Sequence, residues 1–573
     1  MQEQIITSAL EGRDTLAILP TGGGKSICFQ VPAMMKEGIC IVVSPLIALM
    51  KDQVHNLKSR GIPALVVYSG MTAREIDITL DNAAYGDYKF LYVSPERLRT
   101  RLFKSRVTKM NVNYLVVDEA HCISQWGHDF RPDYLEIARI REILSQQVPV
   151  LAMTATATPE VAADIMSSLR FREPNLISGS FERPNLAYVF RKVEDKMGHL
   201  LKVCSNIAGS GIVYVSKRKN AEDLAAFLRA HGIAADCYHA GMPRDSRSTV
   251  QDSWIKGTLR VIVSTNAFGM GIDKPDVRFV CHYDMPETPE GYFQEAGRAG
   301  RDGKDSYAVL LWNGMDLKRL RQLVRTQYPD LDYIRDIYQK VYIYLGYAYE
   351  EGAGAACKFD LEDFAKRFKL HAATAYQAVK YLELSGYWTL TETIHIPSKI
   401  QFSVARDQLY RLQLGSEQMD TFIKLLLRMY SGLFTEYVCI DEEKIARMGG
   451  YAVLSVRERL KELGRKQVIR YIPAIDSPVL YLANERLVEK NLRLPQKDYD
   501  DRVNRHTTRL EAMISMVTDD SECRCLKMYR YFGQKGGGSC GKCDVCLSRK
   551  PGARREEEIS PEVRDEYEEL MEM

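Results

Sequence analysis

Short apolar runs alternate with amphipathic segments through the first 180 residues of the chain. The runs are rich in Val, Ile and Leu, and the segments after them repeat their apolar residues at helical spacing. The runs lie at residues 15–20, 39–45, 64–70, 89–98, 111–117 and 151–160. Apolar strands separated by helices are typical of a parallel sheet that is covered on both faces. Residues 1–180 are therefore predicted to form one doubly wound α/β lobe.

The same alternation begins again at Phe181–Phe190, where the composition of the chain changes. Further apolar runs follow at residues 210–220, 234–242 and 260–284. A second strand series of this kind predicts a second parallel-sheet lobe, which we place at residues 181–325. Two such lobes in tandem imply a cleft between them.

From Met315 to Leu494 the pattern changes to helices with short strands. Pairs of helical patterns followed by strand-like residues are typical of a winged helix, a variant of the helix-turn-helix. We predict one such module at residues 326–410 and a second at 411–495, with a hairpin at Val468–Leu482. Winged helices bind DNA in some proteins and pack against protein in others, and both roles stay open here.

The 573 residues suffice for several domains, in the range of about three to five. Lys and Arg number 78 against 75 Asp and Glu, so the net charge is only +3. Nucleic-acid binding must therefore depend on local basic patches. The sequence lacks a secretory signal and a long apolar run, and most cysteines lie within apolar segments, as in a reduced cytoplasmic protein. The chain begins inside a helical pattern, from which we expect further residues upstream.

Residues Thr21–Ser26 read TGGGKS and lie between a predicted strand and a predicted helix. Glycines let backbone N–H groups approach a phosphate, Lys25 supplies a cation, and Ser26 is a ligand for Mg²⁺. Leu19 stands where the usual phosphate-binding loop has its first glycine, which is the variant form found in helicases. The alternative is a flexible glycine turn beside a surface lysine.

Asp118 and Glu119 follow the apolar run at 111–117, at the strand end where α/β sheets bind ligands. Asp118 could hold Mg²⁺ and Glu119 could polarise a water molecule. The next residues combine aromatic, amide and basic side chains, which would suit a stacking platform for unpaired bases. These residues are His121, Gln125, Trp126, His128, Phe130 and Arg131. The alternative is a polar loop with Trp126 and Phe130 packed in the core.

The second lobe contains the segment Gly291–Gly303, in which Arg298 and Arg301 are three residues apart on a predicted helix. This spacing places both cations on one face. If the lobes close on a nucleotide, these cations can stabilise the charge on the transferred γ-phosphoryl group. Taken in isolation, the two arginines would be ordinary solvated surface charges.

Near residue 540 the sequence reads C-x-x-C-x-x-C, with Gly and Asp between the cysteines Cys540, Cys543 and Cys546. This spacing predicts a zinc site within a helical module at residues 496–550, and a fourth thiolate would make the zinc structural. A disulfide or an iron–sulfur cluster is the weaker alternative. Residues 551–573 are predicted to be a charged, solvated tail.

These motifs, in this order, resemble the RecQ family of superfamily-two ATP-dependent DNA helicases. The matching segments are QEQII, PTGGGKS, SPLIALMKDQ, DEAHCISQWGHDFRP, TATAT, FERPN, YHAGM, STNAFGMGIDKPDVR and QEAGRAGRDG. The HCISQWGHDFRP extension is the most specific of them, because in that family it links ATP hydrolysis to contact with single-stranded DNA. RecQ proteins generally place the zinc module directly after the second lobe, whereas about two hundred residues intervene here.

The resemblance implies that the two lobes are RecA-like, and it implies ATP, Mg²⁺ and a structural Zn²⁺ as cofactors. The implied nucleotide contacts are Gln2, which matches the glutamine that reads adenine, and Thr21, Gly22, Gly23, Gly24, Lys25 and Ser26. Ser26 and Asp118 would hold Mg²⁺, and Glu119 would be the base for the attacking water. Gln294, Arg298 and Arg301 would complete the catalytic site, one arginine acting as the finger. Cys523 would be the fourth zinc ligand, with Cys525 as its rival.

The expected function is 3′-to-5′ DNA unwinding in repair or recombination, coupled to Mg-ATP hydrolysis. The expected substrates are single-stranded and forked DNA, with single-strand-binding or repair proteins as candidate partners. We expect a monomer in the cytoplasm, associated with the nucleoid and not with a membrane. A DNA-stimulated translocase, an RNA helicase and a DNA-binding scaffold without strand separation are the alternatives.

Overall fold

The computed structural model describes most of the chain. The described ranges are 1–20, 22–68, 70–124, 127, 130–144, 147–269, 274–391, 394–396, 398–404, 417–430, 432–473, 475–534 and 537–550. Two compact units are present: the chain up to Arg321 together with residues from Asn504 onward, and Gln322–Val503. None of the helices in the described ranges is long and apolar enough to cross a membrane.

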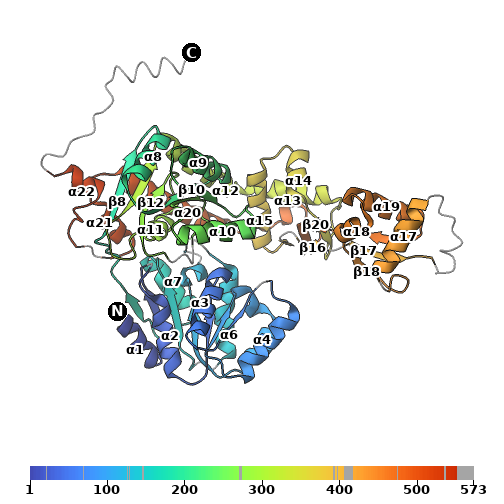
Figure 1. Cartoon of the computed structure of the whole chain (residues 1–573), viewed down its shortest axis with the longest axis horizontal. Coiled ribbons are helices and arrows are strands. Elements are labelled where there is room, and N and C mark those ends of the chain that lie inside the picture. Colours follow the sequence, from blue (N-terminus) through green and yellow to red (C-terminus); the bar gives the residue numbers. More distant parts are fainter. Residues whose placement is uncertain are drawn as a thin grey trace, which may run out of the picture. The chain divides into compact units, whose positions relative to one another are not determined.

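Lobe 1, the blue part of the chain in Figure 1, is built on a seven-stranded parallel sheet. The strand order is β3-β4-β2-β5-β6-β1-β7. Its strands are β1 (Thr15–Ile18), β2 (Ile39–Val43), β3 (Ala64–Val67), β4 (Phe90–Val93), β5 (Val112–Val117), β6 (Val150–Thr154) and β7 (Leu176–Ser178). In the register of the sheet, Ile18 at the end of β1 lies opposite Thr154 and Ser178. This places the segment after β1 beside the ends of β6 and β7.

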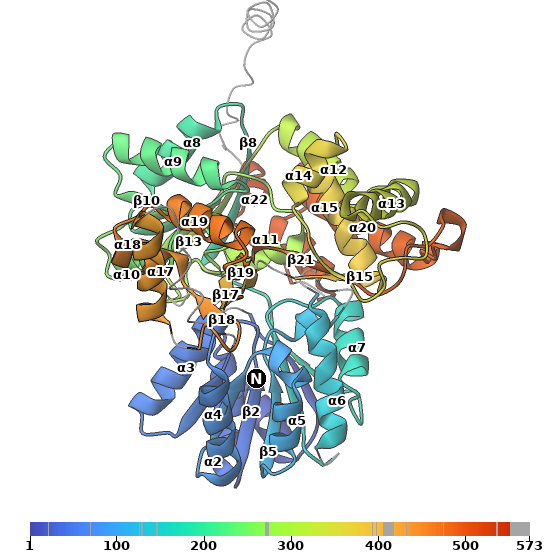
Figure 2. The same ribbon diagram turned by 90° about the vertical axis from the view of Figure 1, so that its right-hand side faces the viewer.

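Helices cover both faces of this sheet. They are α1 (Gln2–Leu10), α2 (Lys25–Met35), α3 (Ile47–Ser59), α4 (Ala73–Tyr85), α5 (Arg101–Val107), α6 (Glu136–Ile143) and α7 (Pro159–Ser168), with short 3-10 turns η1 (Pro95–Arg99), η2 (Ala120–Ile123) and η3 (Pro132–Leu135). One apolar core joins α1, α2 and α3 to the sheet, and α5, α6 and α7 lie on the opposite side (Figure 2). Every residue of β1, β2, β4 and β6 is buried, which explains why these strands read as unbroken apolar runs.

Lobe 2 has a six-stranded parallel sheet in the order β10-β11-β9-β12-β13-β8. Its elements are β8 (Leu186–Lys192), α8 (Lys196–Asn206), β9 (Ser210–Tyr214), α9 (Arg218–Ala230), β10 (Ala235–Tyr238), α10 (Arg244–Ile255), β11 (Val261–Ser264), β12 (Val277–His282), α11 (Pro289–Ala296), β13 (Ser306–Trp312) and α12 (Gly314–Gln327). Apolar residues of α8 and α9 pack on one face, and α10 and α11 lie on the other (Figure 1). The prediction of two parallel-sheet lobes is confirmed.

The C-terminal described part of the first unit is helical and carries the cysteine cluster. Its helices are α20 (Gln496–Thr518), α21 (Arg524–Tyr531) and α22 (Asp544–Ser548). Arg524, which is almost fully buried, donates hydrogen bonds to the Met516 carbonyl at 2.8 Å and to Asp544 Oδ2 at 3.0 Å. A charged group of this kind holds the three helices together, because a buried guanidinium is stable only with its donors satisfied. We call residues 504–550 the zinc module.

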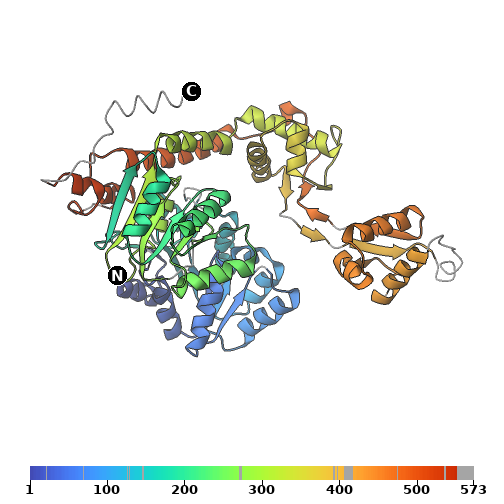
Figure 3. The same ribbon diagram turned by 45° about the horizontal axis from the view of Figure 1, so that its top comes forward.

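The second unit contains two winged-helix modules, and the second module is inserted into the first. The first module comprises α13 (Leu331–Leu345), β14 (Ala356–Lys358), α14 (Leu361–Arg367), α15 (Ala372–Leu384), β15 (Trp388–Leu390), β21 (Val479–Leu482) and the 3-10 turn η4 (Glu489–Asn491). Its antiparallel sheet has the order β14-β21-β15. The connection between β15 and β21, which is the wing, leads through the paired strands β16 (Ile394–Ile396) and β20 (Ile475–Ser477) to the inserted module (Figure 3).

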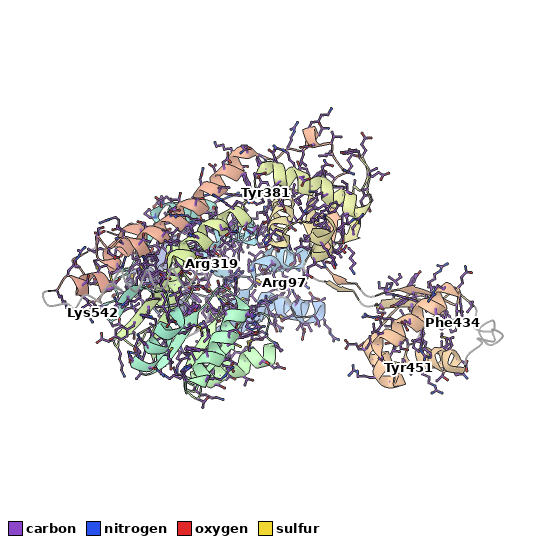
Figure 4. The ribbon with its side chains drawn as sticks, turned by 90° about the horizontal axis from the view of Figure 1, so that it is seen from above. Arg97, Arg319, Tyr381, Phe434, Tyr451 and Lys542 are labelled. Carbon is purple, nitrogen blue, oxygen red and sulfur yellow. The ribbon has the colours of Figure 1, made fainter. Side chains whose placement is uncertain are left out.

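The inserted module has its own sheet and its own core. It comprises β17 (Ser398–Phe402), α17 (Glu417–Met429), β18 (Val438–Ile440), α18 (Glu442–Gly449), α19 (Val453–Arg465) and β19 (Ile469–Ile472). Phe434 and Tyr451, both marked in Figure 4, pack against the core of this module. Phe434 stacks on Phe402 with ring centroids 4.9 Å apart, and Tyr451 lies edge-on to Phe422 at 5.8 Å.

The nested arrangement differs from the sequential one expected from the sequence. The hairpin predicted at Val468–Leu482 is wrong, because β19 pairs with β17 whereas β21 pairs with β14 and β15. Residues 475–503 therefore complete the first module and do not belong to the second. The division expected at residue 410 lies outside the described residues.

Candidate active site

The glycine-rich turn after β1 leads directly into helix α2. Gly22 and Gly24 have left-handed backbone angles, with φ of 83° and 73°, which side chains other than glycine rarely adopt. At Gly23 a Cβ atom would lie 2.9 Å from the Pro20 carbonyl oxygen, so glycine is needed there for space. Lys25 begins α2, and its Nζ lies 3.7 Å from Glu119 Oε1. Backbone amides at a helix start together with this cation can hold the phosphates of a nucleotide.

Asp118 follows the last residue of β5, at the carboxyl end of a central strand. Its carboxylate accepts hydrogen bonds from Ser44 Oγ at 3.1 Å and from the Glu119 N–H at 3.0 Å. Burial, and then the neighbouring Glu119 carboxylate, raises the pKa of Asp118 to about 6, against the opposing effect of Lys25. A half-buried acid that lacks sufficient positive charge nearby suits a divalent cation, whose charge would compensate the carboxylate.

Lobe 2 contributes three of the predicted side chains through α11 and the turn that follows it. Gln294 lies on α11, whereas Arg298 and Arg301 come after the helix ends at Ala296. The prediction that both arginines lie on a helix is therefore wrong, because the helix stops at Gly297 and the chain continues through turns. Arg298 is buried and donates from Nη1 to the Gly269 carbonyl at 2.5 Å. The Arg301 side chain packs against Gly22, where a Cβ atom would lie 3.4 Å from its Cγ.

A cavity of about 340 Å³ joins these groups. Lobe 1 lines it with the phosphate loop, the acidic pair and Ser44, and lobe 2 lines it with Gln294, Arg298 and Arg301. Gln2 Nε2 donates to the Gly23 carbonyl at 3.0 Å, so the first turn of α1 touches the same loop. Thr21 lies outside the described residues. The glycines leave room for phosphate oxygens, and the donor set fits a nucleotide with Mg²⁺.

The segment after Glu119 is tied to the acidic pair through His121. His121 is buried, and its Nδ1 lies 2.9 Å from Thr154 Oγ1 and 3.4 Å from Glu119 Oε2. Phe130 and Arg131 are half-buried, and the Arg131 N–H donates to the Cys122 carbonyl at 2.8 Å. The other predicted members of this platform, Gln125, Trp126 and His128, lie outside the described residues.

Two contacts near the acidic pair were not expected from the sequence. They are the hydrogen bond of Ser44 to Asp118 and that between Thr154 and His121. Ser44 comes directly after β2, at the same sheet edge as Asp118, and this position after an apolar run was the signal that could have found it. Thr154 ends β6 and belongs to the TATAT segment. Its hydrogen bonds to His121 and to the Thr156 carbonyl at 3.2 Å lie within lobe 1.

Four cysteine sulfurs of the zinc module gather in one cluster. Cys523, Cys540, Cys543 and Cys546 place their Sγ atoms within 4.8 Å of one another. The Cys523–Cys543 and Cys540–Cys546 sulfur distances are 3.8 and 3.9 Å, close to the about 3.8 Å edge of a tetrahedron with Zn–S bonds of about 2.3 Å. Backbone N–H groups of Cys540, Cys543 and Cys546 point to sulfurs at 3.3 to 3.4 Å. The cluster fits zinc with Cys523, and not Cys525, as its fourth member.

Two parallel-sheet lobes that share a phosphate loop, an acidic pair and two arginines define a nucleoside-triphosphate-driven motor of the helicase type. Family profiles match the chain in four places: DEAD/DEAH box helicase at residues 1–165, helicase conserved C-terminal domain at 194–303, RecQ helicase winged-helix domain (Bacteroidota) at 400–473, and RecQ zinc-binding at 483–547.

Similar proteins include two from Bacillus subtilis (strain 168). The probable ATP-dependent DNA helicase RecS is 42% identical over 341 residues, which cover 59% of this chain and 68% of that protein. The ATP-dependent DNA helicase RecQ is 44% identical over 325 residues, 56% of this chain and 55% of that protein. A solved structure of the DUF1998 helicase MrfA bound to DNA aligns with 56% of this chain and 50% of its own at 18% identity, with a TM-score of 0.48.

The chain belongs to the RecQ family of ATP-dependent DNA helicases. The match to RecS covers about two thirds of that protein, and the match to RecQ covers about half. The profile matches place a winged helix and the zinc module after both lobes, in the order seen in the fold.

Proposed function

We propose that this protein hydrolyses ATP to move 3′ to 5′ along single-stranded DNA and to unwind duplex DNA in repair or recombination. One observation carries the proposal: a single cavity is lined by Lys25, Glu119, Arg298 and Arg301, which come from two separate lobes. A site divided between lobes turns over only when they approach, so each catalytic cycle changes the distance between the surfaces that hold the DNA.

The residues divide the chemical work as follows. Lys25 and the amides of Gly22, Gly23 and Gly24 hold the β- and γ-phosphates. Ser26 and Asp118 would hold Mg²⁺, which would neutralise phosphate charge. Glu119 Oε1 takes the proton of the attacking water. Arg298 and Arg301 stabilise charge on the γ-phosphoryl group, and Gln294 orients the groups around it. Gln2 recognises the adenine.

The coupling between ATP and DNA is assigned to the segment after Glu119. His121 contacts Glu119 and Thr154 at the carboxyl end of the sheet. Gln125, Trp126, His128, Phe130 and Arg131 supply the stacking and basic groups that single-stranded DNA needs. Movement of bases against this segment would change the position of the catalytic base.

The test is steady-state ATP hydrolysis with and without single-stranded DNA, together with unwinding of two duplexes that carry either a 3′ or a 5′ tail. Stimulation by DNA and unwinding of the 3′-tailed duplex alone are expected. Unwinding of the 5′-tailed duplex would contradict the direction. Stimulation without unwinding of either duplex would identify a translocase, and hydrolysis that does not respond to DNA would leave only a DNA-binding scaffold.

For its surroundings we propose a monomer in the cytoplasm that associates with the nucleoid. Forked DNA is the proposed substrate, and single-strand-binding or repair proteins are the proposed partners. A mass measurement in solution, with and without a forked DNA, tests whether the protein is a monomer. A stable dimer in the absence of DNA would contradict the monomeric state.

A further inference from the structure

Helix α20 of the zinc module carries Arg509 to a point where it contacts both lobes. Arg509 Nη1 donates to the Gly127 carbonyl of lobe 1 at 3.1 Å. Its Nε lies 3.8 Å from Glu290 Oε1 of lobe 2, and the two side chains are only 15% and 4% exposed. One guanidinium therefore connects the segment proposed to contact DNA to the helix that carries Gln294.

Glu290 is a buried acid in the first turn of α11, and two of its partners belong to the zinc module. The Tyr531 hydroxyl donates to Glu290 Oε1 at 2.8 Å, on the same oxygen that faces Arg509. A buried carboxylate is costly unless it is paired, so these two groups determine where Glu290 can lie. Gln294 follows Glu290 by four residues and lies on the same face of α11. A shift of Glu290 is therefore transmitted to Gln294 and to the turn with Arg298.

The residues after Tyr531 fasten the zinc module to the linker between the lobes. Phe532 stacks on Phe181 with ring centroids 4.8 Å apart and lies 5.2 Å from Phe293 of α11. The Phe181 N–H donates to Gln534 Oε1 at 3.0 Å, and Gln534 Nε2 donates to the Gly179 carbonyl. The zinc module is thus held at the linker between the lobes, where the guanidinium of Arg509 can keep its contacts with both lobes.

We propose that Arg509 is a positioning residue that couples DNA contact in lobe 1 to the lobe 2 half of the ATP site. DNA that moves the Gly127 segment changes the hydrogen bond to Arg509, and the ion pair with Glu290 passes this change to α11. This proposal rests on the proposed function, because it requires that the segment after Glu119 contacts DNA. It assigns to the zinc module a role in coupling in addition to its structural role.

The test compares Arg509→Gln with the unaltered protein in ATP hydrolysis at increasing concentrations of a single-stranded oligonucleotide. The expected result is a fall of about fivefold or more in the ratio of DNA-stimulated to DNA-free turnover, the lower end of typical coupling between sites. The KM for ATP without DNA should stay the same within twofold. Arg509→Lys, which keeps the charge, should recover part of the ratio.

Two further variants separate coupling from general damage. Arg321→Gln removes an exposed ion pair, 3.1 Å long, between Arg321 of α12 and Glu511 of α20, the helix that carries Arg509, and should leave the ratio unchanged. The double variant Arg509→Gln with Glu290→Gln should lower the ratio no further than Arg509→Gln alone, because both changes break one connection. Zinc content and melting temperature are measured for every variant.

Suppose that DNA stimulates the unaltered protein and that Arg509→Gln shows the same ratio of DNA-stimulated to DNA-free turnover. This result would overturn the coupling role of Arg509 and leave the proposed function intact. A fall in the ratio that is matched by loss of zinc, or that Arg509→Lys does not relieve at all, would reduce Arg509 to a structural residue and also overturn the coupling role. If the unaltered protein itself does not respond to DNA, the proposed function fails and the coupling role fails with it.

Discussion

At the scale of single residues, Glu119 has an unusual backbone conformation. Its φ and ψ are 47° and 50°, in the left-handed region that residues other than glycine rarely occupy. Such angles cost about 1 to 3 kcal/mol and persist only where surrounding contacts hold them. Here the contacts are Lys25 on one carboxylate oxygen and His121 on the other. The turn directs the carboxylate into the cavity, and the sequence alone could not have revealed this backbone conformation.

Changing Glu119 or Lys25 should stop turnover by different routes. Glu119→Gln keeps the shape of the side chain but removes the base, so turnover should fall by about 100-fold or more while ATP still binds. Lys25→Ala removes the cation at the phosphates, so both turnover and binding should fall. Steady-state hydrolysis and titration with a fluorescent ATP analogue measure the two effects. Glu142→Gln, a change at an exposed position, is the control. Full turnover in Glu119→Gln would overturn the assignment of Glu119 as the base.

Asp14 is a second residue with a large expected effect, in this case on stability. It is 3% exposed and accepts hydrogen bonds from Arg141 Nη2 at 2.5 Å, the Arg172 N–H at 2.8 Å and the Val150 N–H at 3.0 Å. Burial by itself would raise its pKa, but these hydrogen bonds outweigh burial and the pKa lies below its ordinary value.

Asp14→Asn should lower the free energy of unfolding of lobe 1 by about 3 kcal/mol at pH 7, because buried Arg141 loses its charged partner. A lowered pKa means that the carboxylate stabilises the fold above about pH 4 and loses this effect as the pH falls through the folded-state pKa. The difference between the two proteins should therefore shrink below pH 4. Urea midpoints at pH 7 and pH 3.5 measure it, with Asp77→Asn, at a half-buried site of the same lobe, as control. A difference that grows in acid would contradict the argument.

At the scale of elements, the sequence was most informative where structure is local. The apolar runs before Asp118 and before the glycine loop form buried strands in both cases, because a strand covered on both faces needs apolar residues throughout. The end of α11 was missed, since Gly297 stops the helix only one residue before Arg298. The partner of β21 was also missed. Val479, the first residue of β21, accepts a hydrogen bond from the Thr391 hydroxyl 88 residues away, and pairings that distant leave no local pattern.

At the same scale, the cysteine cluster predicts that zinc holds helices α21 and α22 together. Cys543 is fully buried and its side chain accepts the Cys546 N–H at the start of α22. Cys543→Ser should therefore remove the one equivalent of zinc expected per chain and loosen α21 and α22, because structural zinc contributes directly to folding. Metal analysis by mass spectrometry measures this. Cys439→Ser, an exposed cysteine of the inserted module, should keep its zinc, and zinc retained in Cys543→Ser would contradict the four-cysteine site.

At the scale of the whole molecule, the second unit is organised as a module within a module. The chain enters and leaves the inserted module through β16 and β20, where Ile396 lies opposite Ile475. The two modules have separate apolar cores. Entry and exit that lie side by side allow an insertion without disturbing its host.

Removal of residues 398–473, with a short glycine-containing turn between β16 and β20, should leave a folded protein. Zinc content and DNA-stimulated ATP hydrolysis should stay within twofold of the full chain, because the residues lining the ATP cavity lie outside the deletion. Unwinding of the 3′-tailed duplex then shows whether the inserted module takes part in strand separation. A deletion protein that is insoluble or that has lost its zinc would contradict the independence of the two cores.

The contact between Phe181 and Gln534 has a consequence for how the protein is made. The two residues are 353 positions apart in the sequence. At about 5 to 20 residues per second, a ribosome needs about 20 to 70 s to pass from one to the other. During that time both lobes can fold, while Phe181 in the linker still lacks its contacts with Phe532 and Gln534. The linker is therefore covered completely only after the zinc module has been synthesised and has folded.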